Sequence, residues 1–379
     1  MRLFFKGVVK QLLIPFTDKK GVIMFILFLF SAWIAMEAYH SLTVQKLPVA
    51  VVDFDNSALS RSFIKILMNN RTIAVKKRGF DNLKFAKTEL EKGELAGILL
   101  IPSKFSKEIK NGRTAHIAAY LDASNILISK NVNKAILKSA IIMGAGIGVV
   151  KMRHLGMPVE QAVARAMPIE LAAANTFNPA LNYAVYIVPG LLFFLLQVYI
   201  TLLVAGLYQP KLFNGCATSR AGHITGIFIF TLLLALMFYY IWMPYITLTV
   251  HSDFILVLAI TALFIVSEIL FVMAIHKLLF FMPPLAMDAS VLLAMLSLTF
   301  SGITWPTDMF PDWIAAISYI MPFRPFAQSF QVFIHGNVEA ADLLIYIKAL
   351  YTQAAIYGTL SLIMTLFVIL VAKKREKHE

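Results

Sequence analysis

Six stretches of about 20 mostly apolar residues limit the folds open to this 379-residue chain. A run of that length is what a helix needs to cross the hydrocarbon core of a bilayer. Hydrophobic residues make up 59% of the sequence and charged residues only 15%, and a soluble domain cannot bury that much apolar surface. We therefore predict an α-helical polytopic membrane protein with six transmembrane helices. The predicted spans cover about 22–39, 183–207, 224–247, 254–275, 285–303 and 351–372.

The positions of the basic residues indicate how these spans are oriented. Lysine and arginine alternate with apolar residues over 1–20, a pattern typical of a helix lying in the membrane interface, and more basic residues follow the last span. Short basic loops at 208–220 and 276–277 fall on the same side when six spans are threaded. Cytoplasmic loops carry an excess of basic residues, so we expect both termini in the cytoplasm and the protein in the bacterial inner membrane. This placement of the +13 net charge favours membrane orientation over nucleic-acid binding.

The first span, 21–41, has a cleaved signal peptide as its alternative interpretation. Its apolar run begins far from residue 1, however, and no Ala-x-Ala site follows it, so an uncleaved anchor is the better prediction.

Residues 42–182 differ in character from the spans. Short β-type runs at 49–52, 97–101 and 117–121 alternate with polar, helix-favouring stretches, and a longer helical stretch begins at Asn125. This alternation predicts a small inserted α/β domain. Long domains cross a membrane regardless of their charge, so we expect this one to be extracytoplasmic. The remaining five spans fall within 183–379.

The segment at about 305–337 is moderately apolar but repeatedly interrupted by proline, which breaks a continuous helix. Irregular backbone at membrane depth must be shielded by protein or line a water-filled cavity. We predict an outer re-entrant helical hairpin that includes Trp313 and Arg324, with a plain extracellular loop as the alternative. Arg324 could meet an anionic lipid or substrate, or a carboxylate of its own chain. The interrupting prolines are Pro306, Pro311, Pro322 and Pro325.

Three carboxylates lie within or at the ends of predicted spans. An ionisable side chain in a span costs several kcal/mol unless it faces protein or water, so each is a functional candidate. Glu268, about two-thirds along its span, is either a helix-packing partner or a group on a translocation path. Glu37 and Asp288 lie near span ends, where a position among the headgroups is the plainer interpretation.

The sequence carries no pattern of a catalytic or metal site. The single cysteine excludes an internal disulfide, the histidines lack paired ligand spacing, and neither Gly-x-Ser-x-Gly nor His-Glu-x-x-His occurs. Gly144, Gly146 and Gly148 precede Lys151, but not in the order of a phosphate-binding loop, and close helix packing explains them better. We expect no cofactor and no ATP hydrolysis by this chain.

The order of these elements and three stretches of sequence resemble the ABC-2 type permeases. The stretches are PVAVVDFDNSALSR at 48–61, FNPALNYAVYIVPG at 177–190, and SGITWP at 301–306, which continues through 310–313 and 321–322. The resemblance covers essentially the whole chain. It implies an anchor span, an external α/β domain, five more spans and a broken hairpin before the last.

The resemblance also implies a function. The chain would be the permease subunit of an ATP-driven exporter, moving an amphipathic, drug-like or lipid-like solute out of the cytoplasm or inner membrane. It would pair as a homodimer or with a related permease, and separate ATPase subunits would use the ATP. A periplasmic adaptor is a further candidate partner. The alternative is a non-transporting receptor or assembly protein whose outer domain binds a partner, although six spans exceed what an anchor needs. A secondary transporter would usually show inverted repeats.

The loop after the second span departs from the family pattern. In the family, this loop usually carries acidic residues followed by a Gly-Thr pair and contacts the ATPase, whereas residues 209–220 contain no carboxylate. An Asn-Gly pair can still form the turn. We expect the ATPase coupling loop to comprise Lys211, Leu212, Phe213, Asn214, Gly215 and Arg220.

Overall fold

The computed structural model divides the chain into two compact units, which are described separately. The helical unit comprises Met1–Leu42 and Asn175–Glu379, and the α/β unit comprises Thr43–Ala174. The described residues are 1–39, 45–76, 82–168, 183–208, 217–245, 254–335 and 340–375.

The α/β unit is built on a four-stranded sheet with the strand order β2-β1-β3-β4. β1 is parallel to both of its neighbours, whereas β4 is antiparallel to β3. Strands occur at all three predicted runs, and β2 is an additional short strand between polar segments. The strands are β1 (Leu47–Asp53), β2 (Ile73–Lys76), β3 (Gly97–Ile101) and β4 (Ala118–Leu121).

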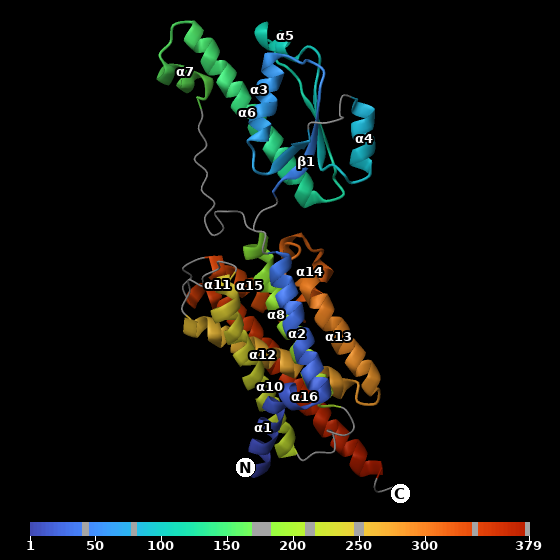
Figure 1. Ribbon diagram of the computed structural model, residues 1–379. Helices are drawn as coiled ribbons and strands as arrows, with labels where there is room; N and C mark the ends of the chain where they lie inside the picture. Colours follow the sequence, from blue (N-terminus) through green and yellow to red (C-terminus); the bar gives the residue numbers. More distant parts are fainter. Residues whose placement is uncertain are drawn as a thin grey trace. The chain divides into compact units, whose positions relative to one another are not determined.

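Helices cover both faces of this sheet (Figure 1). Side chains alternate between the faces of a strand, so Val49 packs with α3 and α6 while Ala50 and Val52 pack with α4. Two separate apolar cores result. The helices of the unit are α3 (Ala58–Met68), α4 (Leu83–Glu91), α5 (Phe105–Lys110), α6 (Ile126–His154) and α7 (Val159–Ala166).

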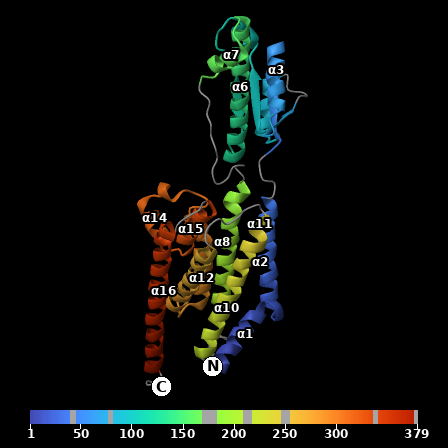
Figure 2. The same cartoon turned by 90° about the vertical axis from the view of Figure 1, so that its left-hand side faces the viewer.

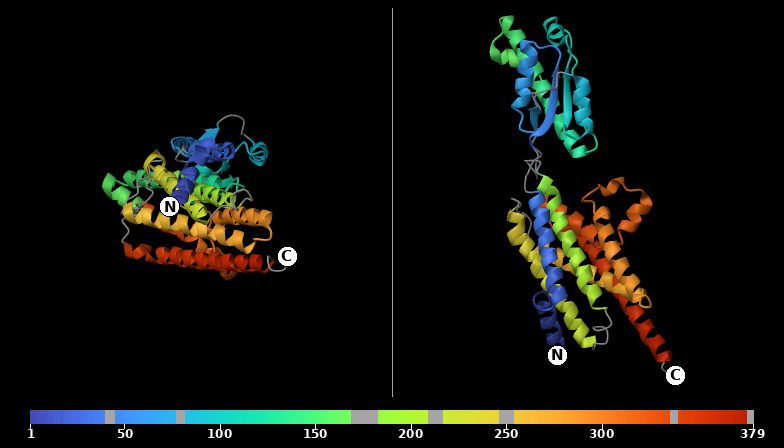
Figure 3. Two further views of the ribbon diagram at one scale, coloured as in Figure 1. Left: turned by 90° about the horizontal axis from the view of Figure 1, so that it is seen from below. Right: turned by 45° about the vertical axis from the view of Figure 1, so that its right-hand side comes forward.

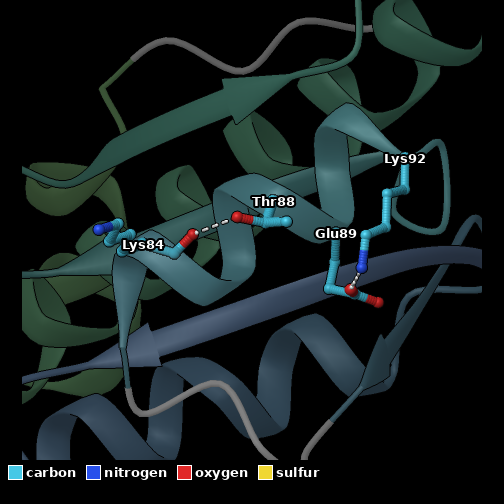
Figure 4. Close-up of polar contacts among 4 residues, drawn as sticks. All are labelled: Lys84, Thr88, Glu89 and Lys92. Carbon is cyan, nitrogen blue, oxygen red and sulfur yellow. Dashed lines mark hydrogen bonds and ion pairs between the residues drawn. The ribbon is translucent and has the colours of Figure 1, made fainter.

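The outer side of α4 carries polar contacts that stay within one helix (Figure 4). Lys92 Nζ lies 2.9 Å from Glu89 Oε1, and Thr88 Oγ1 donates a 3.2 Å hydrogen bond to the carbonyl oxygen of Lys84. Exposed ion pairs contribute little to stability. The unit therefore depends on its two apolar cores and on the polar contacts that join separate elements.

One such contact joins the turn after β1 to the start of α5. The backbone nitrogen of Ser106 donates to both oxygens of Asp55 at 3.2 Å, and Ser106 Oγ donates to Oδ1 at 3.0 Å. Nearby, Ser57 and Ser60 form a capping box at the start of α3, and Ser60 Oγ donates to Asp53 at 2.6 Å. These carboxylates therefore fix where two helices begin.

The helical unit is a bundle in which the start of α1 and the end of α16 lie at the same end (Figures 1 and 2). α10 continues through a π-helical turn, Phe238–Trp242, into the short α11 (Met243–Tyr245). The long helices are α1 (Arg2–Thr17), α2 (Lys19–Ala38), α8 (Tyr183–Gly206), α10 (Ala217–Met237), α12 (Phe254–Leu278), α13 (Pro283–Phe300) and α16 (Ala340–Arg375).

Seven helices among the described residues are long and apolar enough to cross a membrane. Six overlap the predicted spans, although α16 begins well before residue 351. The seventh is α6, which buries Val132, Ala135 and Ile136 in the core beneath the sheet of the α/β unit.

Glycines bring α1 and α10 into backbone contact. A Cβ atom added to Gly7 would lie 2.6 Å from the carbonyl oxygen of Ser219, and Gly222 has no room for one either. Small residues allow this close approach between helices in lipid. Beside the contact, Gln11 Oε1 lies 3.0 Å from Nδ1 of the buried His223. α1, predicted as an interfacial helix, thus packs along the first half of α10.

We predict that Asp55→Ala lowers the protection of α5 amides against hydrogen exchange in the full-length protein, by about 1 kcal/mol of local opening free energy. Burial alone would raise the pKa of Asp55, but hydrogen bonds from Ser57 and Ser106 and the charge of Lys110 outweigh it and hold the pKa below the ordinary 3.8. A depressed folded pKa means that this stabilisation is present above the unfolded pKa. It is lost as pH falls through the folded pKa, so the wild type should approach the variant only below about pH 4.

Asp122→Ala is the matched control. Asp122 Oδ1 accepts a hydrogen bond from the nitrogen of Ser124 within its own turn and joins no second element. Its replacement should leave α5 protection unchanged, and equal effects of the two variants would contradict the role of Asp55.

Candidate functional site

Glu268 lies in α12 and is fully buried. Thr201 Oγ1 donates a 3.0 Å hydrogen bond to Glu268 Oε1, and Gln197 Nε2 donates one of 3.3 Å to Oε2. Gln197 and Thr201 are one turn apart in α8, so the same face of that helix presents both. Each carboxylate oxygen therefore has a partner from α8.

Ser297 extends this arrangement to a third helix. Its hydroxyl on α13 lies 2.7 Å from Gln197 Oε1 and 2.6 Å from the carbonyl oxygen of Ala294. Gln197 thus donates to Glu268 and accepts from Ser297, which fixes the orientation of its amide. We call Glu268, Gln197, Thr201 and Ser297 the buried polar network. The face of α13 that packs inward carries only small buried residues, Ala286, Ser290, Ala294 and Ser297.

Hydrogen bonds alone satisfy the Glu268 carboxyl in the part of the chain that the structure describes, where no basic group forms an ion pair with it. No group of potential metal ligands gathers among the described residues either. Glu37 and Asp288, the other carboxylates singled out from the sequence, are exposed. Of the two roles open to Glu268, burial between α8, α12 and α13 favours helix packing.

A broken helical element follows α13 (orange, Figure 3). Pro306 and Pro311 stand immediately before η2 and α14, and Pro322 stands immediately before α15. At these positions a missing N–H removes no helical hydrogen bond, so the prolines separate helices without leaving a carbonyl unpaired inside one. The pieces are η2 (Thr307–Met309), α14 (Asp312–Ser318) and α15 (Phe323–His335).

This element packs into the core of the helical unit. Ile303 is buried against Gly190 of α8, and its carbonyl oxygen accepts a 2.7 Å hydrogen bond from Tyr186. In α15, Phe323 and Phe326 are fully buried, and the ring of Phe326 stacks on Phe264 of α12 at a centroid distance of 4.3 Å. A plain loop would bury no such face, so this packing favours a helical element over a plain loop.

Arg324 lies buried inside the broken element, where it contacts its own chain. Its Nη1 donates a 2.9 Å hydrogen bond to the carbonyl oxygen of Ala315 and another to Ser318 Oγ. The guanidinium also lies over the ring of Tyr319, 3.9 Å from its centroid. Arg324 therefore binds the carboxyl end of α14, where a cation is favoured by the unpaired carbonyls. Among the described residues, no carboxylate of its own chain, one of the partners expected from the sequence, forms an ion pair with Arg324.

Side chains of α16 bind the turn between α14 and α15. Gln353 Nε2 donates a 2.6 Å hydrogen bond to the carbonyl oxygen of Tyr319. The hydroxyl of Tyr357 donates a hydrogen bond to the carbonyl oxygen of Ile320. The turn bends at Pro322 and cannot pair these carbonyls within a helix. The last long helix supplies the missing donors.

Three further predicted residues of the broken element lie at its surface, whereas Pro322 and Pro325 are buried. Trp313 is 66% exposed, and Pro306 and Pro311 are exposed as well. Trp313 thus faces outward, whereas Arg324, Pro322 and the residues of the buried polar network are buried.

Five of the six residues of the predicted coupling loop lie outside the described residues: Lys211, Leu212, Phe213, Asn214 and Gly215. Arg220 is described and is not in a loop, because α10 already begins at Ala217 and places it in the first turn of that helix. Its charge acts on Tyr208, just after the end of α8, and on Lys277, near the end of α12. Arg220 therefore stands beside the ends of two other long helices.

Several hydrogen-bonding residues of these sites were not predicted from the sequence, among them Gln197, Thr201, Ser297 and Gln353. A signal existed for the first two, because two polar residues one turn apart in an apolar run predict a buried polar face. Ser297 and Gln353 carry no comparable pattern, since Ser297 lies between two leucines and Gln353 lies in a mixed segment.

The comparison with known families agrees with this architecture. The model of the ABC-2 family transporter protein matches residues 19–363. Among curated proteins, none matches the chain. The membrane proteins of this family are generally the non-catalytic permease component and work with ABC ATPase partners. With nearly all of the sequence matched, the chain belongs to the ABC-2 family of transporter proteins.

Proposed function

We propose that the chain is the permease subunit of an ATP-driven ABC-2 type exporter, which moves an amphipathic, drug-like or lipid-like solute out of the cytoplasm or inner membrane. The observation that carries this proposal is the family match, which takes in both units of the chain. The packed broken element adds support, because a receptor that uses its helices only as anchors needs no such element.

For the topology, we propose six spans, formed by α2, α8, α10 with its π-helical extension, α12, α13 and α16. α6 is also apolar enough to span, but its buried face belongs to a sheet-packed core, so we assign it to the external domain at 42–182. An even number of spans agrees with the start of α1 and the end of α16 lying at one end of the bundle (Figure 1). The basic terminal residues favour the cytoplasm for that end of an inner-membrane protein.

For the partners, we propose separate ATPase subunits that use the ATP, together with a second permease copy or a close relative. A periplasmic adaptor could join the external domain. The ATPase would contact the segment 209–220, with Lys211 and Arg220 facing acidic groups and Leu212 and Phe213 as the buried anchor. Arg220 in the first turn of α10 would carry this contact directly into a long helix.

For Glu268, we propose that the buried polar network holds α8, α12 and α13 together during transport. All three helices contribute a hydrogen-bonding side chain, and each bond is shielded from water by the surrounding core. Within lipid, unpaired polar groups cost several kcal/mol, so the network disfavours separation of these helices.

We predict opposite accessibility for cysteines introduced at Ser62 and at Lys377 in a Cys216→Ser background. A membrane-impermeant maleimide added from the outer face should label Ser62→Cys and not Lys377→Cys, because the first is an exposed residue of the proposed external domain and the second lies at the basic C-terminus. Labelling of both positions from outside intact cells would refute this topology.

We predict that Phe213→Ala reduces co-purification of the partner ATPase and its stimulation more than Lys211→Ala does. Truncation of a good apolar anchor costs roughly 2 kcal/mol or more, against about 0–1 kcal/mol for an exposed ion pair. Both variants should insert normally into membranes, and the purified chain alone should not hydrolyse ATP. If Phe213→Ala co-purified with and stimulated the ATPase as the wild type does, the assignment of this loop as the ATPase contact would be wrong. ATP turnover by the chain alone would overturn the proposed function.

We predict that Glu268→Gln stays close to wild type in thermal stability, whereas Glu268→Leu loses about 1–3 kcal/mol because Gln197 and Thr201 are left unpaired. Gln retains the size and one acceptor oxygen for Gln197, and its amide group can donate to Thr201 Oγ1, because a hydroxyl also accepts. Asp288→Leu, at the exposed end of α13, is the control and should have little effect. If Glu268→Gln were as unstable as Glu268→Leu, the ionised carboxylate rather than the packing network would be the essential feature.

A further inference from the structure

The α/β unit contains a cavity of about 370 Å³ between α5, α6 and the segment that leads into β4. This volume lies within the range of small-molecule sites, about 300–1,000 Å³. The apolar part of its wall is formed by Phe63, Phe105, Ile109, Ile117, Met143 and Ile147.

Glycine keeps one wall of this cavity open. Gly144 of α6 lines the cavity, and a Cβ atom added there would meet no atom within 4 Å. The close-packing role expected for the glycines of α6 therefore applies only to Gly148, whose added Cβ would lie 3.1 Å from that of Ala166 in α7. A glycine within a helix costs about 1 kcal/mol relative to alanine, so packing does not explain Gly144.

Two basic residues complete the wall. Lys151 Nζ lies 3.4 Å from the position that a Cβ of Gly112 would occupy, so the ammonium reaches from α6 towards the opposite segment. Arg113 also lines the cavity, and its Nη1 lies 3.9 Å from Glu108 Oε2. Glu108 offsets one of the two positive charges, and the last turn of α6 adds further basic residues. The cavity thus joins an apolar interior to a net positive rim.

We propose that this cavity binds an amphiphile with one apolar chain and one anionic head group, a carboxylate or phosphate. The chain would occupy the space beside Gly144 and Met143, and the head group would bind Lys151 and Arg113. This site lies within the α/β unit and does not rest on the transport activity proposed above.

The test uses the full-length protein in nanodiscs with ¹³C-methyl methionine, because the Met143 methyl group reports on this cavity and not on lipid partitioning. Octyl phosphate should shift the Met143 signal saturably, whereas octyltrimethylammonium at the same concentrations should not. Absence of a saturable shift, or equal shifts with the two probes, would overturn the proposal without any variant being needed.

Two pairs of variants locate the site. Gly144→Leu should weaken octyl phosphate binding about tenfold or more by filling the apolar space, whereas Gly146→Leu, on the same helix but outside the cavity wall, should not. Lys151→Met should weaken binding up to about fivefold, and the exposed Lys138→Met should leave it unchanged. An unchanged Met68 signal in α3 verifies the fold of each variant. Equal affinities within either pair would refute the assigned site.

Discussion

A polar group at membrane depth finds no water, so each must be satisfied by another group of the protein. This constraint accounts for the arrangement of the helical unit. Glu268 is paired by two side chains of α8, and Gln197 is paired in turn by α13. The turn after α14 has carbonyls that no helix can pair, and Gln353 and Tyr357 of α16 bind them. These polar side chains of the bundle thus bind neighbouring helices and irregular backbone.

The same constraint explains why Arg324 faces inward. A guanidinium has five donors and no acceptor, and the carboxyl end of α14 has carbonyls without helical partners. Bringing the two together pairs Nη1 of Arg324 with the carbonyl oxygen of Ala315 and the hydroxyl of Ser318, while the buried Nε has no hydrogen-bond partner among the described residues. The element can therefore be irregular and still bury its own apolar residues, such as Phe326, in the core of the helical unit. Broken helices and inward-facing polar residues have one physical cause here.

Much of this fold could be predicted from the sequence, because length and apolarity identify long helices directly. Pro306, Pro311 and Pro322 mark where η2, α14 and α15 begin. β2 was not predicted, since four residues between polar segments give no clear alternation. The partners of Glu268 and Arg324 depend on which helices become neighbours, and spacing within one helix does not determine that. Hydropathy alone also cannot separate α6 from a span, because its apolar residues serve the core of an α/β unit.

The contact between α1 and α10 has a mechanical consequence. Helices that touch through flexible side chains can slide by rotamer changes, but Gly7 and Gly222 leave only backbone between the two axes. The pair therefore resists shear and bends as one thick rod rather than as two thin ones. Any displacement imposed where α10 begins, beside Arg220, is shared at once by the N-terminal helix. The N-terminal helix α1 therefore stiffens the first half of α10, the third predicted span.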